Sequence, residues 1–327
     1  MNPGSFVTRR YRLDLLGVVV LAIAIVIAGM MIVKSYHLTM LIYTGISAIA
    51  ALGMFILFGY AGQISIGQAA FFGVGAYTSA FVSMHTSLPP VVAIIASVLA
   101  AAAFGWCVSR PLLRLSTNYL AMGTLAFGVI CFVLFAQLRW LTGGIDPGIV
   151  SMPPFQIAGV DLSATRSMYW VVGTLLCLTT LLIINLIHSR IGRALRALKG
   201  SEVATAGLGV DVVRYKVAAF TLAAALAGLA GALFAFFQSA FNASVFNVGM
   251  SIELLVMIVV GSVSSPWGAL FGALFVTFLP SYLEDFEQYK LLIYGVILTV
   301  VVIFMPDGFG KAIIDLVRSR LQRAGAS

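Results

Sequence analysis

The sequence predicts an all-α polytopic membrane protein. Of its 327 residues, 61% are hydrophobic and only 9% are charged, and the mean hydropathy is +1.08. Soluble domains use charged residues at about 25%. Apolar windows recur along the chain, each long enough to cross about 30 Å of hydrocarbon as a helix. No linker rich in Pro, Gly or Ser divides these windows, so we expect residues 1–327 to form a single transmembrane domain.

Eight windows have the length of a spanning helix. They lie near residues 13–33, 39–58, 67–84, 91–109, 118–138, 168–188, 216–238 and 290–305. The first window follows three arginines, as the apolar region of a signal peptide does. However, it is longer than the 7–15 residues of such a region, and no A-x-A cleavage site follows it. We therefore expect this segment to remain as a membrane anchor.

Residues 251–279 have a different pattern. Two short apolar stretches, "SIELLVMIVVG" and "WGALFGALFVTFLP", are separated by "SVSSP". Pro266 and the serines interrupt helical hydrogen bonding, so this region predicts a re-entrant pair of half-helices rather than one long helix. We expect Ser251 to cap the first half-helix and Glu253 to lie in its first turn, where a carboxylate opposes the helix dipole. A position of Glu253 in a transport path stays open as the alternative.

A second interruption lies in "GYAGQISIGQAAFFGVGAYTSA", residues 59–80. Unwound backbone at membrane depth is tolerated only where it lines a cavity walled by protein, and polar side chains are costly there. We predict a broken helix near residues 59–68 that faces a translocation path, and the alternative is that its glycines are ordinary helix contacts. The expected path residues in this stretch are Gly62, Gln63, Ser65, Gly67 and Gln68.

The two interruptions share a weak internal repeat. Gly62, Ser65, Phe72 and Gly73 recur at a constant offset as Gly261, Ser264, Phe271 and Gly272. In a chain so rich in glycine and alanine, such a match also arises by chance. If the repeat is real, Gly261 and Ser264 belong to the same path, as in transporters built from repeats.

Basic residues predict the orientation in the membrane. With eight crossings and a hairpin that returns to its own side, both termini and the loops at 110–114 and 189–216 share one side. That side holds fifteen of the 19 Lys and Arg residues. The positive-inside rule therefore places both termini in the cytoplasm, and the acidic cluster Glu284, Asp285 and Glu287 outside. The net charge of +8 is thus a topogenic signal, and no aromatic stacking motif accompanies it that would favour nucleic acid.

No enzyme, metal or nucleotide site is expected. The only Gly-Lys pair, Gly310-Lys311, is followed by Ala312 and lacks the first glycine of a P-loop, with Met305 in its place. The three histidines are predicted at separate span ends. The single cysteines Cys107, Cys131 and Cys177 are predicted as buried small hydrophobes. No cofactor is implied, and no His, Asp, Ser or Cys constellation at reactive spacing is found.

The segment 189–216 is the best candidate for receiving energy from outside the chain. Ile191, Ala194, Leu195 and Leu198 form an apolar stripe at helical spacing, with basic residues beside it. Ser201 can cap a second short helix, 202–208. An amphipathic surface helix that binds anionic lipid is the alternative.

These motifs resemble one family. "GYAGQISIGQAAFFGVGAYTSA", "TNYLAMGTLAFGVI", "LTGG", "SRIGRALRALKGSEVATAGLGVDVVRYK" and "SIELLVMIVVGSVSSPWGALFGAL" occur in the order found in LivM-type permease subunits of bacterial ABC importers for branched-chain amino acids. The similarity runs from about residue 40 to 310. It implies a multi-pass protein of the bacterial inner membrane that does not hydrolyse ATP itself.

The resemblance also implies partners and a coupling element. The expected partners are a homologous second permease, two ATP-binding subunits, a periplasmic or lipoprotein substrate-binding protein, and membrane lipid. The loop 189–216 would dock on the ATPase through a coupling helix with the residues Glu202, Ala204, Gly207 and Gly209. A permease for urea or amides is the nearest alternative, and an ion-coupled secondary transporter is a more distant one.

Overall fold

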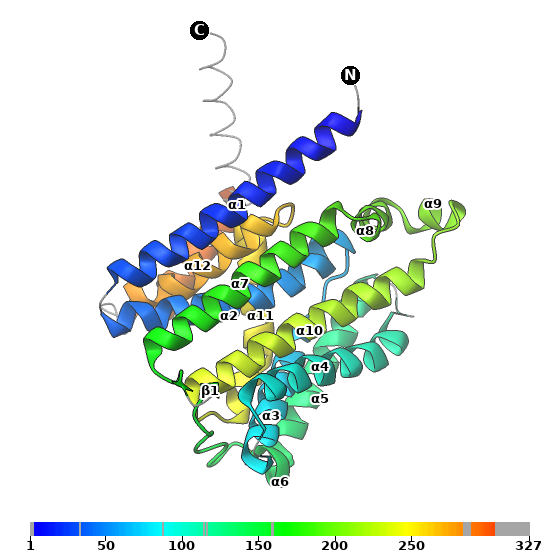
Figure 1. Cartoon of the computed structure of the whole chain (residues 1–327). Coiled ribbons are helices and arrows are strands. Elements are labelled where there is room, and N and C mark those ends of the chain that lie inside the picture. Colours follow the sequence, from blue (N-terminus) through cyan, green and yellow to red (C-terminus); the bar gives the residue numbers. More distant parts are fainter. Residues whose placement is uncertain are drawn as a thin grey trace.

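Figure 1 shows the computed structural model of the chain, which describes residues 3–304 except 33, 87, 114, 116, 158–159 and 284–288. The Gly310-Lys311 pair, the acidic cluster Glu284, Asp285 and Glu287, and the basic residues of the C-terminal tail lie outside the described residues. The predictions made for them are therefore not addressed by the structure.

The described chain is almost entirely helical, as predicted. The helices are α1 (Pro3–Met31), α2 (Ser35–Phe55), α3 (Gln68–His85), α4 (Pro90–Leu112), α5 (Thr117–Gln137), α6 (Arg139–Thr142), α7 (Thr165–His188), α8 (Arg190–Gly200), α9 (Glu202–Gly207), α10 (Val212–Gln238), α11 (Val248–Gly261), α12 (Pro266–Tyr282) and α13 (Lys290–Phe304). A π-helical turn, Ile56–Tyr60, extends α2, and a 3₁₀ turn, Ala243–Phe246, precedes α11. Two-residue strands β1 (Gln156–Ile157) and β2 (Val160–Asp161) pair antiparallel in the loop before α7.

The predicted spans can be compared with the helices of the described residues. Each of the eight predicted windows lies on a helix, but within the described residues only six helices are both long and apolar enough to span a membrane: α1, α2, α4, α5, α7 and α10. The pair α11 and α12 raises this number to seven if it is one span. Within the described residues α13 has 15 residues and ends where the description ends, and α3 starts at Gln68 because residues 61–67 are unwound. The described part of the chain is therefore an all-α polytopic bundle, as predicted, with six to seven candidate spans.

Helices α11 and α12 confirm the predicted break between residues 251 and 279. Their axes bend by 119° across the residues between Gly261 and Pro266. Pro266 stands at the first position of α12, where an amide hydrogen would have no partner within the helix, so it suits the start of this second helix.

Helix α10 is the central packing element. It contacts α4, α3 and α2, and α2 and α10 are the most buried of the long helices. Glycine makes this packing close: a Cβ atom at Gly75 of α3 would overlap the backbone of Gly228 in α10, and one at Gly231 would overlap the carbonyl of Phe72. Small residues at such positions let two helix backbones approach where lipid offers no hydrophobic driving force.

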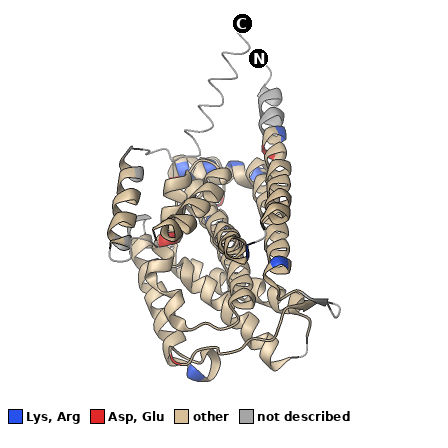
Figure 2. Cartoon of the chain, turned by 90° about the vertical axis from the view of Figure 1, so that its left-hand side faces the viewer, with Lys and Arg blue, Asp and Glu red and all other residues tan. Residues whose placement is uncertain are grey.

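Charge is distributed unevenly along the bundle. Most of the Lys and Arg residues drawn in Figure 2 lie at the end near the N-terminus, and fewer lie at the opposite end. The first turns of α1 meet the last turn of α7 at this end, where the His188 ring and the Asp14 carboxylate pair at 2.8 Å. Helices α8 and α9 follow directly after His188, so the N-terminus and the segment 189–216 share one end of the molecule (Figure 1).

The cysteines only partly follow the prediction. Cys131 is buried and Cys177 is partly buried, but Cys107 is exposed on α4. The prediction for Cys107 is wrong because an apolar position of a membrane helix can face lipid as well as protein. By contrast, His37, His85 and His188 lie near helix ends and apart from one another, as predicted.

The glycine contact between α3 and α10 gives a direct test of the packing. We expect Gly75→Leu to destabilise the purified protein by on the order of 3 kcal/mol, because the new side chain meets backbone that cannot move independently. Gly295→Leu in α13 is the matched control, since a Cβ there has no neighbour within 4 Å among the described residues. Thermal unfolding in detergent measures both, and equal midpoints would contradict this account of the core.

Candidate functional site

The broken helix near residues 59–68 is present. Helix α2 ends in the π-helical turn Ile56–Tyr60, and residues 61–67 are non-helical before α3 begins at Gln68. The amides of Ala61 and Gln63 bond back to the carbonyls of Ile56 and Leu57, each at 2.9 Å. Gly62 has φ = +67°, a left-handed conformation that glycine adopts without strain. This single turn directs the chain away from the α2 axis.

Two hydroxyls and a carbonyl of other helices accept hydrogen bonds from the break and from the start of α3. The Ile66 amide donates to the Thr124 hydroxyl of α5 at 3.0 Å, and the Ala69 amide donates to the Ser251 hydroxyl of α11 at 2.9 Å. The Gln68 side-chain amide donates to the Ala223 carbonyl of α10 at 2.8 Å. The end of the unwound segment and the start of α3 are therefore held by three helices that are distant in sequence.

The bond to Ser251 corrects one prediction. Ser251 does not cap α11, because Asn247 does so by accepting from the Met250 amide at 3.2 Å. The 3₁₀ turn before Asn247 starts the helix earlier than the sequence pattern indicates. Glu253 consequently lies beyond the first turn of α11, and Ser251 is free to bond α3.

Several polar atoms of the break remain without a partner among the described residues. Gln63, Ser65 and Gln68 are each at most 2% exposed. Both polar atoms of the Gln63 side chain, the Ser65 hydroxyl and the Gln68 oxygen have no hydrogen bond within that part of the chain. Burying such groups unpaired costs about 1–3 kcal/mol each, so these atoms suit a ligand, water or another chain that reaches them.

Two of the glycines predicted for the path are less available to a ligand. A Cβ at Gly67 would lie 2.6 Å from the Thr124 carbonyl, and one at Gly261 would overlap the backbone of Gly268. These two glycines therefore allow close packing. Ser264 lies in the second break, where its hydroxyl is 3.0 Å from that of Ser262.

The two breaks touch each other. A Cβ at Gly59 would lie 2.7 Å from the carbonyl oxygen of Val263, so the π-helical turn packs directly on the residues between α11 and α12. Ser262 has φ = +155°, a strained value for a residue other than glycine. The two segments are thus in contact, and the internal repeat stays a prediction.

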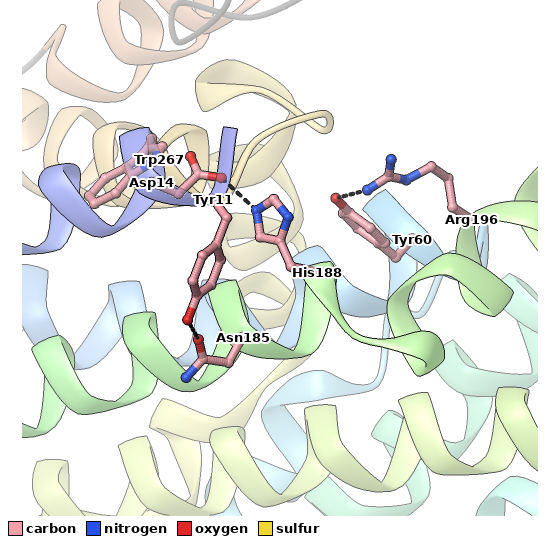
Figure 3. Close-up of polar contacts among 7 residues, drawn as sticks. All are labelled: Tyr11, Asp14, Tyr60, Asn185, His188, Arg196 and Trp267. Atoms are coloured by element: carbon pink, nitrogen blue, oxygen red, sulfur yellow. Dashed lines mark hydrogen bonds and ion pairs between the residues drawn. The ribbon is translucent and has the colours of Figure 1, made fainter. Parts of the chain in front are cut away.

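Helix α8 holds the first break from the side of the segment 189–216. The Lys199 ammonium donates to the Gly59 carbonyl at 2.9 Å, and the Arg196 guanidinium donates to the Tyr60 hydroxyl at 3.0 Å. Figure 3 shows the Arg196–Tyr60 contact and, on the neighbouring helix end, the Asp14–His188 pair. The sequence pattern marks these basic residues but contains no signal for their acceptors, which lie far away in sequence.

Helices α8 and α9 form as predicted. Ser189 caps α8, and Ser201 caps α9 by accepting from the Ala204 amide at 3.2 Å. Leu195 and Leu198 of the predicted stripe are buried, whereas Ile191 is exposed. Glu202 forms an ion pair with Lys216 of α10.

The far side of α9 is open. Val203 and Leu208 are 85% and 82% exposed, and no described atom lies within 4 Å of a Cβ placed at Gly207 or Gly209. The sequence analysis missed Val203 and Leu208, since a six-residue helix is too short for a periodic signal. Glycines and exposed apolar side chains together form a surface suited to a protein contact.

Comparison with known proteins identifies the family. The sequence profile described as "Branched-chain amino acid transport system / permease component" matches residues 36–305. The chain belongs to this permease family. It is 31% identical over 288 residues to the high-affinity branched-chain amino acid transport system permease protein LivM of Escherichia coli K12, covering 81% of this chain and 68% of LivM.

Other relatives of the permease come from the same kind of transport system. LivH of Salmonella typhimurium is 26% identical over 282 residues, covering 80% of this chain and 90% of LivH. BraD of Pseudomonas aeruginosa is 25% identical over 298 residues, covering 84% and 95%. No solved structure matches the chain. The permease is accordingly a transport component of a membrane, and the resemblance predicted from its motifs is confirmed.

The unpartnered atoms of the break give a test within this permease. We expect Gln63→Leu to raise or preserve thermal stability, because it removes two buried atoms without partners, and to lower transport at least about tenfold. Thr221→Val is the matched control, because it removes another buried unpartnered oxygen, on α10. Transport at the original rate in Gln63→Leu would exclude this side chain from the path.

Proposed function

We propose that this chain is a transmembrane permease subunit of an ATP-driven ABC importer for branched-chain amino acids. It forms half of a translocation path, with a homologous permease supplying the other half and two separate subunits hydrolysing ATP. The observation that carries the proposal is the match to branched-chain amino acid permeases over residues 36–305. The occurrence of both LivM and LivH among the relatives supports a pair of permeases.

The arrangement in the membrane follows from the same proposal. The chain lies in a bacterial inner membrane with both termini and the segment 189–216 in the cytoplasm. The clustering of basic residues at one end of the bundle supports this orientation. A periplasmic or lipoprotein substrate-binding protein delivers the amino acid on the opposite side.

The translocation path runs beside the two breaks, with Gln63, Ser65, Gln68 and Ser264 offering polar groups. Gly62, Gly67 and Gly261 shape it by permitting the turn and the close packing that hold those groups. A zwitterionic amino acid needs polar partners during its passage, and unwound backbone supplies them inside a protein-walled route.

Coupling to ATP hydrolysis uses α9 and α8. The open surface of Val203, Gly207, Leu208 and Gly209 docks on the ATPase, and Glu202 and Ala204 support the start of the helix. Movement of this loop reaches the first break because Arg196 and Lys199 of α8 bond the residues Tyr60 and Gly59. The basic residues therefore act as positioning groups for the break.

Purification and reconstitution test the proposal as a whole. A tagged copy isolated from its host should bring with it a second permease and two ATPases. In proteoliposomes this complex and its binding protein should accumulate leucine only with ATP. Uptake by the lone chain without ATP would contradict the proposal. Binding of urea or amides in place of amino acids by the binding protein would favour the alternative substrate class.

The docking surface gives a second test. A Cβ at Gly207 has no described neighbour within 4 Å, so for Gly207→Trp we expect normal insertion but loss of ATPase association and of ligand-stimulated hydrolysis. Gly207→Ala should be nearly silent, and Glu202→Ala should be mild because a dipole contribution at an exposed site is roughly 0.3–1 kcal/mol. Pull-down of the ATPase measures all three variants. Full association in Gly207→Trp would show that α9 is not the docking element, and α8 would then be the next candidate.

The link between α8 and the break gives a third test. In the double variant Arg196→Gln and Lys199→Met, the complex should still assemble, but stimulated transport should fall about tenfold or more, because two charge-assisted hydrogen bonds to the break are lost. Arg190→Gln, an exposed position on the same helix, is the control. Unchanged coupling in the double variant would show that these contacts only pack the loop.

A further inference from the structure

A recess of about 360 Å³ opens beside α11, and no residue of α8 lines it. Its floor is formed by Ile46 and Phe72, which are 2% and 1% exposed. Aromatic and aliphatic walls surround the floor, formed by Tyr43, Phe234 and Met250. Because Phe234 is near the C-terminal end of α10, the recess lies toward the end of the bundle opposite α9. Its volume falls within the usual range for small-molecule sites.

Glu253 is the one ionisable carboxylate on the lining of this recess. The lining contains no Lys, Arg or His, and its other polar side chains are the uncharged Tyr43, Ser47, Ser244 and Asn247. Among the described residues, the Glu253 carboxylate has no ion pair or hydrogen bond. Asp14, the other carboxylate within a described membrane-spanning helix, differs in this respect because it pairs with His188 at 2.8 Å.

Glu253 therefore does not have the structural role predicted for it, which was to oppose the helix dipole in the first turn of α11. Because Asn247 rather than Ser251 caps α11, Glu253 lies beyond the first turn, on an exposed face of the helix that opens to the recess. An ionisable group at membrane depth is costly unless a partner compensates it. A cation that enters the recess would supply that partner.

We propose that this recess is a binding site for a small primary ammonium compound with an apolar body. Glu253 accepts the ammonium group, and Ile46, Phe72, Phe234 and Met250 surround the apolar part. The inference rests on the proposed function, since the α-amino group and side chain of a branched-chain amino acid have this chemistry. It goes beyond that function by assigning the ammonium group to one carboxylate, outside the two breaks.

Direct binding to the purified permease–ATPase complex in nanodiscs, without the binding protein, tests the site. The probes are radiolabelled leucine, with isopentylamine and 4-methylpentanoate as competitors that lack the carboxylate and the amino group respectively. In the original complex, isopentylamine should compete and 4-methylpentanoate should not. In Glu253→Gln, we expect the affinity for leucine and isopentylamine to fall about ten- to hundredfold, because a charge-assisted hydrogen bond is lost.

Asp146→Asn is the matched control, because it removes the same charge from an exposed loop residue outside the recess lining. Its affinities should not change. Equal affinity in Glu253→Gln and the original complex would overturn the inference. So would loss of subunit association in Glu253→Gln, since Glu253 would then pair with a partner subunit. Absence of leucine uptake by the original complex, with isopentylamine still bound through Glu253, would overturn the proposed function alone.

Discussion

The close contact between α3 and α10 is the interaction on which the rest of the structure depends. At Gly75, Gly228 and Gly231 the two backbones approach without intervening side chains. Helix α10 begins directly after α9 and the Asp211 cap, accepts the Gln68 amide at Ala223, and ends beside the recess with Phe234. One helix therefore joins the open surface of α9, the first break and the recess, so a displacement of any of them is resisted by the same contact.

The first break persists because other elements bond part of its backbone and the residues that flank it. In hydrocarbon an unpaired amide costs several kcal/mol, which makes an isolated unwound segment untenable. Here Thr124, Ser251 and Ala223 come from three helices, and Lys199 and Arg196 approach from a fourth. The groups left over are side-chain atoms of Gln63, Ser65 and Gln68. Polarity is thus concentrated where a polar solute could use it.

Glycine serves three different purposes in this fold, although the sequence pattern makes its glycines look alike. Gly62 supplies a left-handed turn, Gly67 and Gly261 permit backbone contact, and Gly207 leaves a surface open. The purpose depends on what lies opposite each residue. The local spacing of glycines in the sequence does not tell these surroundings apart. A glycine can face a carbonyl from a distant helix, a turn of the same chain or empty space.

The sequence by itself determined the helical membrane class, the interruptions near 59–68 and within 251–279, the helices α8 and α9 with the Ser201 cap of α9, and the family. These features depend on local composition, on hydrogen-bonding residues next to one another, or on motifs read in order. Only the tertiary structure decided that Asn247 rather than Ser251 caps α11, that Glu253 faces a recess, and that Lys199 and Arg196 bond the first break. Each of these depends on groups brought together from distant segments by helix packing, and a linear pattern carries no information about which face of one helix meets which face of another.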